Sequence, residues 1–161
     1  MIKKNNLNKG FGLVEIIMGV SIAIIVFLSI GQVMILSLKV SSDKDLKLRA
    51  LNLAKEGIEV VRNIRDDGWT SRITTLTSGT TYYVATSTNQ WILTTLNPGL
   101  IENNFTRTVT VSNVARDGNF NIVTSGGVND PGTKKVTSTV YWNGTAKNIQ
   151  LVAYIANILN D

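Results

Sequence analysis

One carboxylate, that of Glu15, lies at the start of a long apolar run. Residues 16–38 carry no charge and consist mainly of Ile, Val, Leu and Met. A helix of this length crosses a hydrocarbon core of about 30 Å. An unpaired carboxylate costs at least about 2.5 kcal/mol at the centre of a membrane and usually marks a functional partner. We therefore expect Glu15 either to pair with a cation or to lie near the lipid headgroups, where it stays hydrated.

The chain contains neither cysteine nor histidine. Their absence excludes disulfides, thiol nucleophiles and thiolate metal sites, and it removes most zinc sites and the commonest proton shuttle. We therefore predict that the protein is not an enzyme and that it has no catalytic residues, no cofactor and no metal.

Two acids, Asp117 and Asp130, lie in residues 115–133, a segment dense in Gly, Asn and Asp. Carboxylates in such a segment can contribute to a calcium site, but two acids beside glycines are also the ordinary composition of turns. The segment is expected to be a long loop or an irregular hairpin, and no metal is predicted there.

The formal net charge of +5 is concentrated at the N-terminus. Lys3, Lys4 and Lys9 supply three of these charges and leave +2 on residues 11–161. The remaining charges are nearly balanced and form no basic stripe, so nucleic acid is not an expected partner.

Residues 1–10 are polar, basic and free of acids, which is typical of the leader of an exported or membrane-inserted protein. Three interpretations are open for the segment that follows: a cleaved secretory signal, a permanent membrane anchor, or a segment processed on the leader side of the apolar run. An ordinary signal has a shorter apolar core and a cut after small residues, and neither feature is clear here. The acid-free leader favours a cytoplasmic N-terminus, and residues 11–40 are expected to form the hydrophobic transmembrane helix.

Residues 41–68 are expected to continue this helix with an amphipathic pattern. No Pro interrupts residues 41–67, and small and apolar residues recur at helical spacing, with the charged residues mostly off this stripe. The stripe consists of Ala50, Ala54, Gly57, Ile58 and Val61. We predict one helix from about residue 11 to about residue 65, on the order of 80 Å long. Gly57 costs such a helix about 1 kcal/mol relative to Ala, and close approach of a strand would explain its presence.

Residues 69–161 are richer in Thr, Asn, Ser and Gly and are predicted to form an antiparallel β domain. Short runs of β-branched and aromatic residues predict strands. These runs cover residues 81–86, 90–95, 105–114, 134–142 and 147–155. Asn143-Gly144 separates the last two and is a strong hairpin signal, so we expect these two strands to be antiparallel neighbours.

The run at residues 105–111 alternates Thr with Arg107, Val109 and Val111, so one face should be buried and needs a partner. The stripe on residues 50–61 can supply that partner. The predicted fold class is therefore α+β: a long N-terminal helix, transmembrane in its first half and amphipathic in its second, packed on a small antiparallel sheet.

The order of these features resembles the type IV pilin superfamily, and the predicted layout is similar to the pilin fold. Precursors in that superfamily carry a short positive leader ending in Gly, then an aromatic residue, then a Leu-Val-Glu step that opens a long hydrophobic helix. Here the matching stretch is KGFGLVEII, residues 9–17. Gly12 departs from the commonest residue of the superfamily at that position, which is Thr, and the C-terminal Cys pair of many Gram-negative members is missing.

The resemblance implies roles for three residues. Gly10 would be the last leader residue recognised by the prepilin peptidase, Phe11 would become the N-methylated N-terminus, and Glu15 would act in assembly as the fifth residue of the mature chain. Its carboxylate would meet the α-amino group of a neighbouring subunit, which offsets the desolvation of both groups and sets the axial register. The implied partners are the peptidase, other pilin subunits, the pilus assembly platform and, before assembly, membrane lipid.

The function implied by the resemblance is that of a structural subunit of a type IV pilus or related filament. The second half of the helix and the terminal strands look like those of minor pilins, and a pseudopilin of type II secretion is the alternative. The subunit would span the inner or cytoplasmic membrane before assembly. It would then lie on the cell surface, or in the periplasm if it is a pseudopilin.

An interpretation of another class is a signal-anchored extracellular binding or adhesion module. Trp69, Trp91 or Trp142 would then be exposed and would stack on carbohydrate. Such residues more often pack in a core or between helix and sheet, and we predict packing here. A DNA-binding tip pilin is a third interpretation, for which the near-neutral β domain gives little support.

Overall fold

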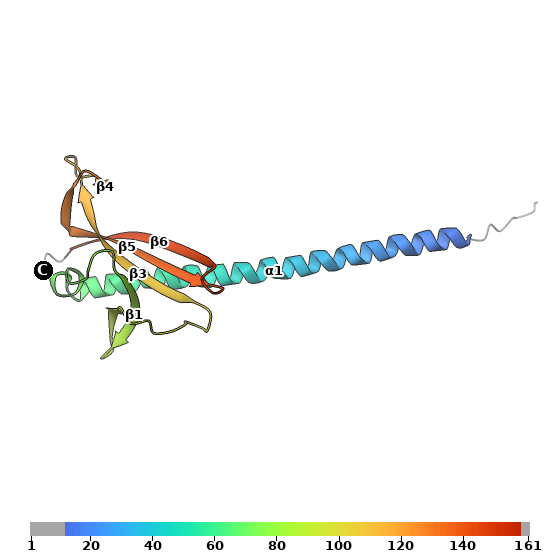
Figure 1. Ribbon diagram of the computed structural model, residues 1–161, viewed down its shortest axis with the longest axis horizontal. Helices are drawn as coiled ribbons and strands as arrows, with labels where there is room; N and C mark the ends of the chain where they lie inside the picture. Colours follow the sequence, from blue (N-terminus) through green and yellow to red (C-terminus); the bar gives the residue numbers. More distant parts are fainter. Residues whose placement is uncertain (1–11, 159–161) are drawn as a thin grey trace, which may run out of the picture. The chain divides into compact units, whose positions relative to one another are not determined.

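The computed structural model describes residues 12–158 of the chain. The chain forms two compact units, which divide between Lys44 and Asp45. The first unit holds the N-terminal part of helix α1 (Leu13–Asp66), and the second holds the remainder of α1 and all of the strands (Figure 1). The predicted α+β class is confirmed: a long N-terminal apolar helix is followed by an antiparallel sheet, against which its amphipathic part packs.

The amphipathic part of α1 buries the stripe that the sequence predicted. Its five residues are all buried, and Val60 and Ile64 join them. The helix ends at Asp66, and Gly68 follows with a φ of 150°, a conformation that favours glycine. A short π-helix, η1 (Trp69–Ile73), comes next, which the sequence pattern did not predict. It buries Trp69 and Ile73 at the end of the core.

Six antiparallel strands form the sheet. The five predicted strands are present, and their bounds are β1 (Thr81–Ser87), β2 (Gln90–Thr94), β3 (Thr106–Arg116), β5 (Val128–Trp142) and β6 (Lys147–Ala156). The sixth strand, β4 (Ile122–Val123), pairs with β3, and the others lie in the order β2-β1-β3-β5-β6. Of the two expectations for residues 115–133, the irregular hairpin is confirmed, since β3 and β5 extend into this segment with a register shift between Asn113 and Val114.

The turn between β5 and β6 differs in detail from a two-residue hairpin. The two strands are antiparallel neighbours as predicted, with Trp142 opposite Lys147, so four residues connect them. The backbone N–H of Ala146 donates to the carbonyl of Asn143 at 3.2 Å, which places Gly144 and Thr145 at the centre of the turn. Both central residues have a positive φ, 62° and 74°, as a primed turn requires.

The core of the second unit lies between α1 and one face of the sheet. Figure 1 shows β3, β5 and β6 alongside the C-terminal part of α1. One cluster joins helix residues such as Val61 and Ile64 to Val109, Val111 and Val136, and a second joins Ala50 and Ala54 to Phe105, Val140 and Trp142.

Arg107 is a charged residue on the buried face of β3. Its side chain is only 7% exposed, in keeping with the predicted alternation of buried and solvent-facing residues along β3. The burial of this charge is possible because groups on α1 bind the guanidinium. Its guanidinium donates to the carboxylate of Glu56 at 3.0 Å and to the carbonyl of Leu53 at 3.2 Å. A buried charge with both an ionic and a hydrogen-bonding partner avoids the cost of desolvation without compensation.

Gly57 lies at a close approach of α1 to β5, which is the explanation that the sequence suggested for this glycine. A Cβ placed on Gly57 would overlap Oγ of Ser138 and would lie 3.2 Å from Cδ of Arg107. Ser138 is fully buried. The missing side chain is therefore what allows the strand to lie against the helix at this point.

Candidate functional site

Glu15 and the start of the apolar run lie in the first turn of α1. The backbone N–H groups of Glu15 and Ile16 donate to the carbonyl of Gly12 at 3.0 and 3.3 Å. Glu15 lies in this first turn, where the unpaired backbone N–H groups of the helix favour a negative charge. Of the three residues expected to act in processing and assembly, Glu15 is described, whereas Gly10 and Phe11 lie outside the described residues.

Gly12 and Gly19 flank Glu15 along the helix, at positions three residues before it and four residues after it. Residues at these spacings lie on the same face of an α-helix. Among the described residues, a Cβ at either glycine would meet no atom within 4 Å. The helix surface beside the carboxylate is therefore open, and another chain can approach its backbone closely.

The apolar run itself is uncovered. Every large apolar side chain from Leu13 to Leu38 is at least half exposed, from 50% at Val26 to 76% at Leu13. A contiguous apolar surface of this extent marks contact with a membrane or with protein. By length and composition, α1 is the one helix among the described residues that is apolar enough to span a membrane.

Two hydroxyl groups within this run are satisfied by the helix itself. Ser21 donates to the carbonyl of Ile17 at 2.7 Å, and Ser29 donates to the carbonyl of Ile25 at 2.8 Å. A hydroxyl that bonds to the carbonyl one turn earlier needs no water, so it is tolerated in hydrocarbon. Glu15 is then the one charged side chain of residues 12–38.

The two acids of residues 115–133 are engaged separately. Asp130 accepts from Nε of Arg116 at 2.6 Å, and Asp117 accepts from the backbone N–H groups of Asn119 and Asn121, each at 2.9 Å. The hydrogen bond from Arg116 lowers the pKa of Asp130, and the N–H of Asn121 lowers the pKa of Asp117. Within residues 12–158 no three His, Cys, Asp or Glu side chains gather in a way that could hold a metal ion.

The pairing of Asp130 with Arg116 predicts a pH dependence of stability. Because the pKa is lower in the folded chain than the unfolded value of about 3.9, the pair stabilises the fold above that value and loses its effect as the pH falls through the folded pKa. We expect Asp130→Asn to cost about 1 kcal/mol at pH 7, a modest value for a partly exposed pair, and progressively less below about pH 4. Chemical unfolding of both chains from pH 7 to pH 2 measures the difference, and a constant difference over that range would contradict the assignment.

The tryptophans are mainly packing residues, as predicted. Trp69 and Trp142 are buried, at 3% and 5% exposure, and Trp91 is partly buried against the core. Trp69 and Trp142 therefore present no open ring face of the kind that the carbohydrate-binding interpretation required. Trp91, in contrast, is half-buried beside α1 and lines a pocket with Val60 and Asn63.

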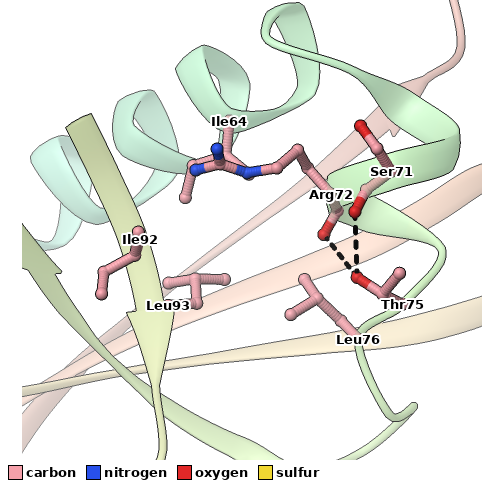
Figure 2. A pocket seen from close by; sticks show the side chains of 7 residues that line it. All are labelled: Ile64, Ser71, Arg72, Thr75, Leu76, Ile92 and Leu93. Atoms are coloured by element: carbon pink, nitrogen blue, oxygen red, sulfur yellow. Dashed lines mark hydrogen bonds between the residues drawn. The ribbon is translucent and has the colours of Figure 1, made fainter. Parts of the chain in front are cut away.

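A cavity of about 180 Å³ lies between η1 and β2 (Figure 2). Figure 2 shows Ile64, Leu76, Ile92 and Leu93 around it, with Arg72 reaching in from η1. Nη2 of Arg72 donates to the carbonyl of Trp91 at 2.7 Å, and the Thr75 hydroxyl donates back to the carbonyls of Arg72 and Ser71. These polar groups are used to hold β2 and η1 in place, so we assign the cavity no ligand.

A second cavity was not predicted from the sequence. It lies beside Tyr141, between the loop that precedes β3 and the turn between β5 and β6. Two short stretches of the sequence around this cavity, Asn103-Asn104 and Asn143-Gly144, indicate turns. They do not indicate that the two turns lie beside the same cavity.

The chain was compared with family models, with curated proteins and with solved structures, and none of the three comparisons found a match. The function is therefore inferred from the residues and the geometry above.

Proposed function

We propose that this chain is a structural subunit of a type IV pilus or a related filament, and within that class a minor pilin. The observation that carries the proposal is the uncovered apolar face of α1, from Leu13 to Leu38, with a single carboxylate at its head. The stretch KGFGLVEII places that carboxylate five residues after a glycine that ends a basic leader. The role is structural rather than catalytic.

In this proposal the prepilin peptidase removes residues 1–10, and the new N-terminus at Phe11 is methylated. Cleavage would create a cationic amine at Phe11, four residues before Glu15 in the sequence. An amine of one subunit and the carboxylate of its neighbour then form a charge-assisted pair, which offsets the cost of keeping either group in an apolar surrounding. The glycines on both sides of Glu15 support this step because they leave the approach to the carboxylate open.

The apolar run would serve in two surroundings. It first anchors the subunit in the inner or cytoplasmic membrane with the N-terminus on the cytoplasmic side, and it then packs against copies of itself and other pilins in the filament core. The pilus assembly platform would mediate the transfer of the subunit from the membrane into the filament. The second unit, with its sheet, would face the outside of the filament, at the cell surface.

Mass spectrometry of the protein from its native host tests the proposal. We expect a chain that begins at methylated Phe11, because the leader ends in Gly and the apolar run has no clear cut at its far end. An intact Met1 would contradict filament processing and would support a permanently anchored binding module, and a cut near Ser41 would support an ordinary secreted domain. A pseudopilin would show the same N-terminus but would remain in the periplasm, which cell fractionation distinguishes.

A further inference from the structure

The cavity beside Tyr141 has about 140 Å³ of space and is formed by two turns and two strand ends. Its lining contains no charged side chain. The residues are Leu100, Asn103, Asn104, Thr106, Tyr141, Trp142, Gly144 and Thr145. An uncharged lining of amides, hydroxyls and aromatic rings fits a neutral ligand that both donates and accepts hydrogen bonds.

The polar side chains of this lining are available to form hydrogen bonds with a ligand. The side chains of Asn103, Asn104, Thr106, Tyr141 and Thr145 make no hydrogen bond to any other described residue. The indole N–H of Trp142 has no acceptor among the described residues, but it is itself buried, so it is not counted among the groups that a ligand would reach. The cavity beside Arg72 differs in this respect, because its guanidinium and hydroxyl groups bond to the protein itself.

The backbone around the cavity is held in conformations that most residues avoid. Glu102, Asn103, Asn143 and Thr145 all have a positive φ, between 49° and 74°. These angles belong to the two turns that border the cavity, the one before β3 and the one between β5 and β6. The bridge between Ile101 and Phe105 holds the first of these turns through bonds of 2.8 and 2.9 Å.

We propose that this cavity binds one ring of a neutral saccharide. A sugar ring combines hydroxyl groups, which match the amides of Asn103 and Asn104, with an apolar face, which matches the ring of Tyr141. The absence of charge in the lining disfavours acidic sugars, since a carboxylate would be desolvated there without a partner. The site is independent of the processing proposed for the N-terminus, and a subunit that carries it would adhere to a glycan surface.

Titration of the full chain with saccharides tests this inference. The probes are glucose, galactose and N-acetylglucosamine, with glucuronate as the charged comparison, and the chain is kept in a phosphocholine detergent because maltoside detergents carry sugar. We expect at least one neutral sugar to shift the amide resonances of Asn103, Asn104 and Gly144, with a dissociation constant of about 1 mM for so small a ligand.

Two variants separate the site from non-specific effects. Tyr141→Leu should weaken binding about tenfold, the usual worth of an aromatic contact. Asn103→Gly keeps the positive φ but removes the amide, and it should also weaken binding. Tyr154→Leu, on an exposed tyrosine outside the cavity, should leave binding unchanged. The inference is overturned if no neutral sugar gives saturable shifts, or if a folded Asn103→Gly chain and a folded Tyr141→Leu chain bind as the parent does.

Discussion

Replacing Glu15 with alanine is expected to reduce incorporation of the subunit into filaments by two orders of magnitude or more, while removal of residues 1–10 continues. In the proposed filament, the change would leave the amine of a neighbouring chain without its counter-ion in an apolar surrounding. Breaking a buried ion pair by removing one partner costs about 3–5 kcal/mol, which corresponds to a factor of at least about 100 in an equilibrium. The measurement is the amount of processed subunit in sheared filaments relative to the amount in the membrane.

Matched variants distinguish charge from shape in this experiment. Glu15→Gln keeps the size of the side chain and removes the charge, so it should fail as Glu15→Ala does. Glu59→Ala removes a carboxylate from an exposed position of α1 and should assemble normally. Normal incorporation of Glu15→Gln would show that pairing with the amine is not required for assembly.

Substitution of Gly57 is expected to have the largest effect on the stability of the second unit. Overpacking of a filled core costs about 1–3 kcal/mol, which exceeds the gain of about 1 kcal/mol that alanine brings to a helix. We therefore expect Gly57→Ala to lower the free energy of unfolding by about 1–2 kcal/mol, and Gly57→Leu by about 3 kcal/mol or more. Denaturant unfolding, followed by the fluorescence of the buried Trp69 and Trp142, measures both.

Ser138 provides the double-mutant test of this explanation. Its Oγ is buried, has no hydrogen-bond partner in residues 12–158, and is the atom that a Cβ at Gly57 would overlap. Ser138→Ala alone should raise stability by about 1 kcal/mol, because it removes an unsatisfied hydroxyl. The double variant should then recover most of the loss seen in Gly57→Ala. If the two changes in the free energy of unfolding are purely additive, the side chains at the two positions do not contact each other.

Much of the fold follows from periodicity in the sequence. The stripe from Ala50 to Val61 and the alternation of Arg107, Val109 and Val111 identify the two surfaces that are buried against each other. Gly57 has its explanation in the close contact with Ser138, and the five predicted strands are present within a few residues at each end, except for β5, which begins six residues earlier.

Other elements depend on contacts between distant residues and could not be predicted. The π-helix η1 has no periodic signal in five residues, and it is held by burial of Trp69 and by the bond from Arg72 to the carbonyl of Trp91. The cavity beside Tyr141 joins residues about 40 positions apart, so no local pattern reveals it. For the proposed assembly site, the motif around Glu15 predicted the residue, and the structure adds the two open glycines beside it.

The hydroxyls of Ser21 and Ser29 donate to carbonyls of their own helix, so these two groups keep their hydrogen bonds in whatever medium surrounds the segment. In the proposed filament this segment would leave fatty acyl chains for a bundle of similar helices, and the medium around its apolar side chains would change little. The preference for one medium over the other would then rest on the charged end of the segment, where Glu15 lies.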